Sequence, residues 1–308
     1  MPKPGKLHSP VFWVALVCLT LVPDLLLHAA DMKPEEVVAK HLDSIGTAPA
    51  RAAIKNRVVQ GSAKFKLIVG GSGELDGKGG LVSEQHKSNF VLKFNGDYRG
   101  EQIVSDGDKA YVAVTLANHK RSNFGEFIHT QDFVVKEGLL GGELSTGWAL
   151  ANLDKLPGKL EYAGLKKFDG QSVMDLRYHS KKHDDMNIHI YLDPQTFRHI
   201  ATVYLIELSP NLGGQGGPSA TDQVGLTSSV DRPGADVTQS ARQRQIRYTV
   251  EERFTDFKAF DGLTLPSHYN LRFTQELQSG STILDNWDLN ADDIAHNVSL
   301  DPRNFEVK

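Results

Sequence analysis

IRYTVEERFTDFKAFDGLTLPSHYNLRF, residues 246–273, predicts two strands joined at Asp261-Gly262. An Asp-Gly pair between two alternating runs favours a type I′ turn, because that turn needs positive φ at both central positions. A two-residue turn fixes the register of the hairpin, and a slip of one residue would move every apolar side chain to the other face. The apolar pairs that follow are Phe260 with Leu263, Phe254 with Tyr269, and Val250 with Phe273.

Pro266 adds a constraint on the neighbouring strand. In this register it faces Phe257 in a non-hydrogen-bonded pair, so the backbone position that lacks an N–H points to the next strand over. The sequence therefore predicts an edge, a bulge or a strand end at Pro266.

Outside the hairpin, a period of two recurs along the chain and predicts further strands. Turn pairs such as Asp-Gly and Asp-Pro separate them at regular spacing, which favours an antiparallel meander over alternating β–α units. Glycine-rich turns are predicted near residues 70–73 and 77–80. The predicted strands cover residues 57–69, 81–85, 89–95, 98–105, 110–114, 160–168, 171–179, 186–192, 198–208 and 281–289.

Three segments predict helices. Residues 33–46 carry Pro34 and two glutamates in the first turn and apolar residues at helical spacing, and a shorter helix is predicted at 48–56. Phe124 to Leu140 holds a further apolar stripe. This third segment is either a helix that plugs the open side of a curved sheet or a mobile lid over a hydrophobic cavity.

Composition excludes several classes of protein. The 308 residues carry 34 basic and 38 acidic side chains, a formal charge of −4, which gives no electrostatic case for nucleic acid. The mean hydropathy of −0.33 argues against a polytopic membrane protein.

The N-terminal segment predicts export. Lys3 and Lys6 precede an apolar run at 11–22 that has the length of a signal-peptide core, and cleavage is predicted near Ala30. An uncleaved anchor running to Leu27 is the alternative. Cys18, the only cysteine, lies in this segment, so residues 31–308 can form no disulfide and offer no thiolate.

Two polar stretches admit two interpretations each. Residues 209–244 are rich in glycine, serine and threonine and predict a long flexible loop, either functional or disordered. His179, His183 and His189, with Asp184-Asp185 between them, are either metal ligands or part of a solvated turn. Strand-like alternation on both sides favours the turn.

No catalytic signature is present in the sequence. It holds no H-E-x-x-H, no G-x-S-x-G elbow and no P-loop. We therefore predict no catalytic, cofactor-binding or metal-binding residue, and a protein that is not an enzyme. A hydrolase with an unrecognised site stays open as a further class.

Residues 257–273, FKAFDGLTLPSHYNLRF, resemble the strand–turn–strand of the LolA/LolB-like superfamily of periplasmic lipoprotein and lipid carriers, the outer membrane lipoprotein-sorting type. Proteins of this superfamily often carry D-G-x-x-x-P late in the chain. The early short helix and the closing segment with Pro302 and Phe305 are also similar. The resemblance implies a mainly β (α+β) fold over residues 31–308: one antiparallel, strongly curved, open half-barrel sheet with a few helices covering its concave side.

The resemblance further implies an exported, non-covalent carrier or binding protein for lipid or lipoprotein acyl chains in the periplasm. Its partners would be a lipid or an acylated lipoprotein and a donor or acceptor protein of the inner or outer membrane. The alternative is a structural or interaction domain of the envelope with the same fold. Residues predicted to line a hydrophobic cavity are Phe65, Leu67, Phe90, Leu92, Phe94, Phe124, Phe127, Ile188, Ile190, Tyr248, Val250, Leu271 and Phe273.

Overall fold

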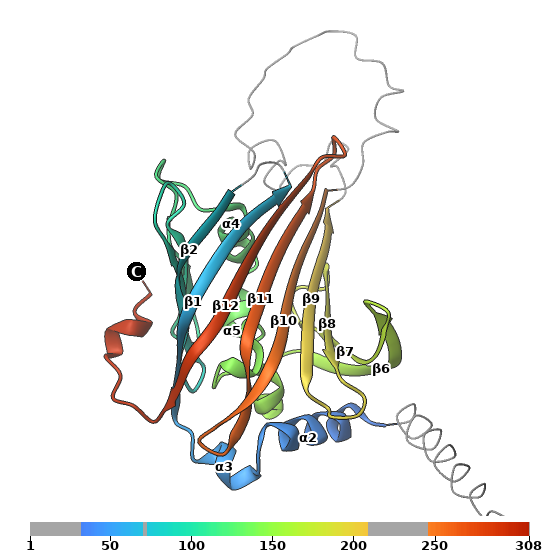
Figure 1. Ribbon diagram of the computed structural model, residues 1–308. Coiled ribbons are helices and arrows are strands. Elements are labelled where there is room, and N and C mark those ends of the chain that lie inside the picture. The colour runs from blue at the N-terminus through green and yellow to red at the C-terminus, as the bar shows by residue number, and fades with distance from the viewer. Residues whose placement is uncertain (1–31, 70–72, 209–245, 308) are drawn as a thin grey trace, which may run out of the picture.

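The computed structural model describes residues 32–69, 73–208 and 246–307. The predicted leader at 1–30, the turn at 70–73 and the loop at 209–244 fall wholly or mostly outside these residues. Within them lies one antiparallel sheet of twelve strands, strongly curved and not closed into a barrel (Figure 1). The strands are β1 (Asn56–Val69), β2 (Gly73–Glu84), β3 (Lys87–Phe94), β4 (Gly100–Ser105), β5 (Ala110–Val112), β6 (Lys159–Phe168), β7 (Gln171–His179), β8 (Met186–Leu192), β9 (His199–Leu208), β10 (Ile246–Phe260), β11 (Leu263–Glu276) and β12 (Thr282–His296).

The sheet is a meander whose first and last strands meet in its middle. The strand order is β5-β4-β3-β2-β1-β12-β11-β10-β9-β8-β7-β6. Strands consecutive in sequence pair with one another, except that β5 and β6 lie at opposite edges, and β1 pairs with β12. The predicted mainly β fold with an antiparallel meander is confirmed.

The register predicted for the hairpin is also confirmed. Phe260 pairs with Leu263, Phe254 with Tyr269, and Val250 with Phe273. Asp261 and Gly262 have φ of 50° and 81°, as a turn with two positive φ values requires.

Pro266 faces Phe257, and β12 pairs with β11 only from His268 onward. β12 itself continues to His296 in its pairing with β1, but its pairing with β11 stops before the proline. Pro266 therefore lies where β11 has an edge, as predicted.

One predicted turn is wrong. Residues 77–80 do not turn but lie inside β2. Gly77 and Gly79 instead make room for side chains of β3, since a Cβ on Gly79 would lie 2.6 Å from the Leu92 side chain. The glycines serve close packing on the inner face of the sheet.

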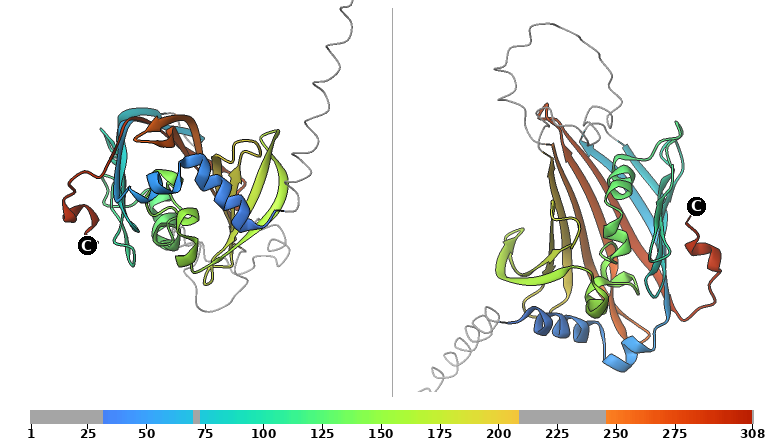
Figure 2. Two further views of the ribbon diagram at one scale, coloured as in Figure 1. Left: turned by 90° about the horizontal axis from the view of Figure 1, so that it is seen from below. Right: turned by 180° about the vertical axis from the view of Figure 1, so that it is seen from behind.

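Most of the helices lie at one end or on the concave face of the sheet. They are α2 (Pro34–Ile45), α3 (Ala48–Ala52), α4 (Asn123–Thr130), α5 (Phe133–Lys136), η1 (Gly142–Leu144), η2 (Ala149–Lys155) and η4 (Pro302–Phe305). Figure 2 shows α2 crossing one end of the half-barrel, while η4 lies on the outer side near β3 and β4. None of the helices in the described ranges is long and apolar enough to cross a membrane.

Residues 113–158, here called the crossover segment, join the two edges of the sheet. They leave edge strand β5, run along the concave face as α4, α5, η1 and η2, and enter the opposite edge strand β6 (Figure 2). The side chains of Phe124, Ile128, Phe133 and Val134 are buried in the main core. The predicted plug is confirmed, although a break at residues 131–132 divides the expected helix in two.

Gly138 shows how tightly the crossover segment is folded on itself. It has φ of +70°, and a Cβ there would lie 1.9 Å from the Gly147 carbonyl oxygen. We expect Gly138→Ala to lower the free energy of unfolding by about 2 kcal/mol through backbone strain and this clash.

Gly170→Ala is the matched control for this prediction. Gly170 also has positive φ, but a Cβ there would meet no other part of the chain within 4 Å, so only the conformational cost of about 1 kcal/mol applies. Equal losses in urea denaturation of the two variants would contradict the close approach at Gly138.

Candidate functional site

Most of the predicted cavity residues lie on the concave face but are packed as core. Phe90, Leu92, Ile188, Ile190, Val250, Leu271 and Phe273 are buried with at most 3% exposure, and Phe94 is buried at 6%. The ring of Phe124 from α4 lies 6.0 Å from that of Phe273 and 5.2 Å from that of Trp287. The middle of the half-barrel is therefore filled by side chains. Phe65 is half-buried against this core, and Leu67 is half-buried near the end of β1.

A groove of about 580 Å³ remains at the mouth of the half-barrel, at the end opposite α2. Of the predicted cavity residues, Phe127 and Tyr248 line it. One wall is formed by α4 and the loop before it, and the other by the ends of β9 to β12. The lining residues are Val114, Leu116, His119, Lys120, Arg121, Ser122, Asn123, Glu126, Phe127, Thr130, Gln131, Ile206, Leu208, Tyr248, Gln275, Leu277 and Ile283.

The two walls of the groove differ in chemistry. The sheet wall is mainly apolar, with Ile206, Tyr248 and Leu277. The α4 wall carries the basic run His119-Lys120-Arg121 and a single acidic residue, Glu126, whose carboxylate lies 3.3 Å from the Arg121 guanidinium. The groove is thus amphipathic.

Leu92 and Phe94 reach a second groove of about 510 Å³ beside edge strand β5. Its lining is mixed, with Lys93, Arg99 and Gln102 among its residues. It offers less continuous apolar surface than the groove at the mouth.

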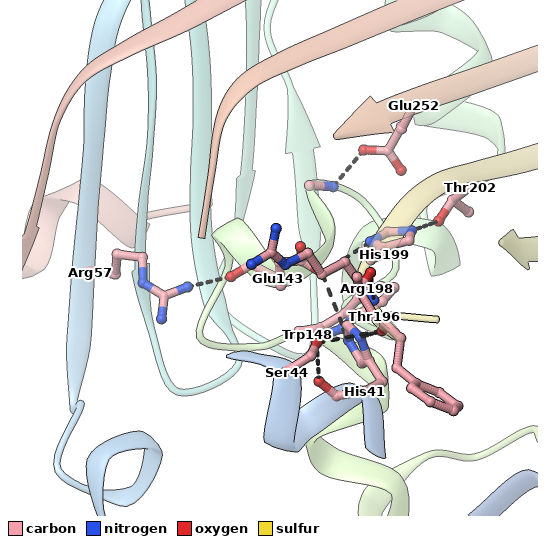
Figure 3. A network of polar contacts seen from close by, with 12 residues as sticks. His41, Ser44, Arg57, Glu143, Trp148, Thr196, Arg198, His199, Thr202 and Glu252 are labelled. Carbon is pink, nitrogen blue, oxygen red and sulfur yellow. Dashed lines mark hydrogen bonds and ion pairs between the residues drawn. The ribbon is translucent and has the colours of Figure 1, made fainter. Parts of the chain in front are cut away.

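A buried polar cluster, which sequence reasoning missed, joins the crossover segment to α2, β1 and β9 (Figure 3). Trp148 donates its indole N–H to Nε2 of His41 at 3.1 Å, so the imidazole proton sits on Nδ1 and is donated to the Phe197 carbonyl at 2.9 Å. The ring of His199 stacks on Trp148 at 4.9 Å. Arg57 of β1 donates to the Glu143 carbonyl oxygen.

The carboxylate of Glu143 lies between the two histidines. Its Oε2 is 3.3 Å from Nδ1 of His199 and 3.7 Å from Nε2 of His41, but among the described residues neither of its oxygens makes a hydrogen bond. Burial raises the pKa of Glu143 to about 7 and lowers that of His199 to about 3. Burial also lowers the pKa of His41, so both histidines are uncharged near neutral pH and these contacts are not ion pairs.

All of these side chains are buried, with at most 5% exposure. No solute can reach the imidazoles or the Glu143 carboxylate without a rearrangement of the crossover segment. The cluster therefore stabilises the fold, because it joins η1 and η2 to α2, β1 and β9.

Two further buried carboxylates hold the crossover segment to the sheet. Glu252 of β10 accepts the backbone N–H of Gly141 at 2.7 Å, and also the hydroxyls of Tyr204 at 2.6 Å and Tyr269 at 2.7 Å. Glu101 of β4 accepts the hydroxyl of Ser122, the N-cap residue of α4.

Burial raises the pKa of Glu252 and of Glu101 to about 7. Both carboxyls therefore lose their proton near neutral pH. The groups that hold the crossover segment to the sheet thus change charge in that range.

The three histidines considered as metal ligands are separated by the structure. His179 lies 3.3 Å from Glu161, His189 lies 2.8 Å from Asp175, and His183 stacks on Phe133 of α5 at 4.1 Å. Across residues 32–69, 73–208 and 246–307, no three side chains of the metal-binding types are arranged to hold an ion.

The sheet is similar to that of a LolA superfamily protein. That protein, from Nitrosomonas europaea, aligns at a TM-score of 0.44 and 13% identity over 90% of this chain and 98% of its own. A DUF1329 family protein from Desulfovibrio piger aligns at 0.43 and 12%, over 89% and 98% of the two chains. An outer membrane lipoprotein-sorting protein domain from Vibrio parahaemolyticus aligns at 0.37 and 11%, over 88% and 95%.

No protein-family model and no curated protein matches the chain.

Proposed function

We propose that the protein is a non-covalent carrier or binding protein for lipid or lipoprotein acyl chains, exported to the cell envelope. The groove at the mouth supports this proposal, because a space of about 580 Å³ with an apolar wall is typical in size of a small-molecule site. Burial of an acyl chain there would contribute about 0.8 kcal/mol per methylene before ordering costs.

Exposed apolar side chains at the groove also support it. Val114 is 47% exposed and Leu208 is 37% exposed, and both line the groove. A bound chain would remove this surface from water.

Export and cell-envelope partners belong to the same proposal. The basic residues and apolar run before Ala30 are the reason to place the protein outside the cytoplasm. A carrier of this kind would take its cargo from a membrane or a donor protein and pass it to an acceptor, with no covalent step.

The rival role is a structural or interaction domain, which the packed middle of the half-barrel favours. Native mass spectrometry with lipid extraction separates the two roles. Near-stoichiometric lipid or acylated peptide on the purified protein is expected. A mass that stays unshifted after incubation with lipid would favour the structural domain.

A variant that fills the groove tests whether the acyl chain binds there. Thr130 lies on α4 and lines the groove, so Thr130→Trp is expected to weaken acyl-chain binding about tenfold or more in a fluorescence displacement assay.

His129→Trp is the control for this variant, because the exposed His129 lies on the same helix and does not line the groove. We expect it to bind like the wild type. Equal affinities of all three proteins would place the acyl chain elsewhere.

A further inference from the structure

The groove at the mouth is lined by more basic than acidic side chains, whereas the chain as a whole has more acidic than basic ones. The chain carries a formal charge of −4, yet the groove has Lys120, Arg121 and His119 on its rim against one acidic residue. Because Arg121 already contacts Glu126, the remaining positive charge is carried by Lys120, which is exposed, with His119 beside it.

The loop that carries these residues is held in place. Leu116 forms a bridge with Tyr98, and the backbone N–H of Leu116 donates to the Lys120 carbonyl at 3.0 Å. Arg121 is fixed by its Nε, which donates to the Val112 carbonyl at 2.9 Å. The basic run is therefore presented to the groove by a closed turn of the backbone.

The N-terminus of α4 lies at the same rim. Ser122, its N-cap, and Asn123 both line the groove. Because the Ser122 hydroxyl is already donated to the buried Glu101 carboxyl, Lys120 is the main source of attraction for an anion at this rim.

Among the described residues, the opposite wall of the groove carries no charged side chain. Ile206, Leu208, Leu277 and Ile283 are apolar, and the hydroxyl of Tyr248 accepts a hydrogen bond from Gln275 at 3.3 Å. A ligand that satisfies both walls needs an apolar chain on one side and an anionic group on the other.

We propose that the groove binds an amphiphile with an acyl chain and an anionic headgroup, with the chain on the ends of β9 to β12 and the headgroup beside Lys120 and Arg121. This inference rests on the proposed function, which it narrows to a class of cargo. The headgroup chemistry is that of a phosphate or carboxylate.

Surfactants with one common chain test this directly. The full-length protein is titrated calorimetrically, below the micelle-forming concentrations, with dodecyl phosphate, dodecyl maltoside, dodecyltrimethylammonium and inorganic phosphate. Dodecyl phosphate is expected to bind about tenfold more tightly than the neutral maltoside, and its affinity should fall with added salt. The cationic surfactant should bind most weakly.

Lys120→Glu is expected to weaken dodecyl phosphate binding about tenfold while leaving the maltoside affinity within about twofold. Lys78→Glu is the control, because Lys78 is exposed on β2 and does not line the groove. It should leave both affinities unchanged.

The outcomes separate this inference from the proposed function. Equal affinity for the phosphate and maltoside surfactants would overturn the headgroup preference and keep the acyl-chain site. Binding of inorganic phosphate as tight as that of dodecyl phosphate would overturn the amphiphile and leave a phosphate site. No binding of any surfactant would overturn the proposed function itself.

Discussion

Replacing Glu252 by glutamine is expected to flatten the pH dependence of stability. Between about pH 5 and pH 8, the free energy of unfolding of the wild-type protein should fall by about 2–3 kcal/mol more than that of Glu252→Gln. Burial raises the pKa of this carboxyl from its usual 4.5 to about 7 in the folded protein. The folded state therefore holds a proton that the unfolded state releases.

The sign follows from this difference in bound protons. The contribution of Glu252 to stability is fully present below pH 4.5, where both states are protonated, and is lost as the pH rises through about 7. The groups that face the carboxyl are the hydroxyls of Tyr204 and Tyr269, whose pKa burial raises well above the usual value, so they do not titrate in this window.

Urea denaturation at several pH values checks this prediction. Glu101 and Glu143 also have pKa values raised by burial, and His199 has one lowered by burial, but these groups are common to both proteins and cancel in the difference. Glu101→Gln should show a difference of the same sign. Parallel curves for the wild type and Glu252→Gln would contradict a protonated Glu252 in the folded state.

Trp148→Ala is expected to lower the free energy of unfolding by about 3–5 kcal/mol. Trp148 is 1% exposed, stacks on His199, and donates its N–H to His41. Truncation leaves a cavity and removes the donor that fixes the tautomer of His41. The crossover segment then loses this hydrogen bond to α2.

Trp148→Phe leaves a smaller cavity than Trp148→Ala, because it keeps one aromatic ring, but it also removes the indole N–H. Its cost should be near 1–3 kcal/mol, roughly the range for a buried acceptor left without its donor. Chemical denaturation and near-ultraviolet circular dichroism measure both variants. A loss below about 1 kcal/mol in Trp148→Ala would show that the polar cluster does not hold the crossover segment.

Local chemistry made the sheet predictable. The Asp261-Gly262 turn sets the register of the central hairpin, and alternation along β3, β8 and β10 places the correct side chains on the concave face. These signals lie within a few residues of one another. The turn predicted at residues 77–80 was wrong, because glycine permits both a turn and the close packing of neighbouring side chains.

The candidate site was only partly predictable. Phe127 and Tyr248 were placed in a cavity, but the basic rim at 119–121 was missed, because only the fold brings that loop to the ends of β9 to β12. The polar cluster depends on contacts as distant as His41 with Phe197, 156 residues later. One signal was available: Glu252 shares the inward parity of Val250 and Phe254, and a carboxylate on an apolar face needs buried partners.

The pairing of β1 with β12 has a consequence for how the molecule assembles. The side chain of Asn56, at the start of β1, donates to the Val298 carbonyl 242 residues later. Such high contact order predicts slow folding, because closing this long loop costs entropy before any pairing compensates it. During synthesis, the edges of β1 and β11 that pair with β12 stay unpaired until β12 emerges. The nascent chain is therefore most prone to aggregate before this last long strand is made.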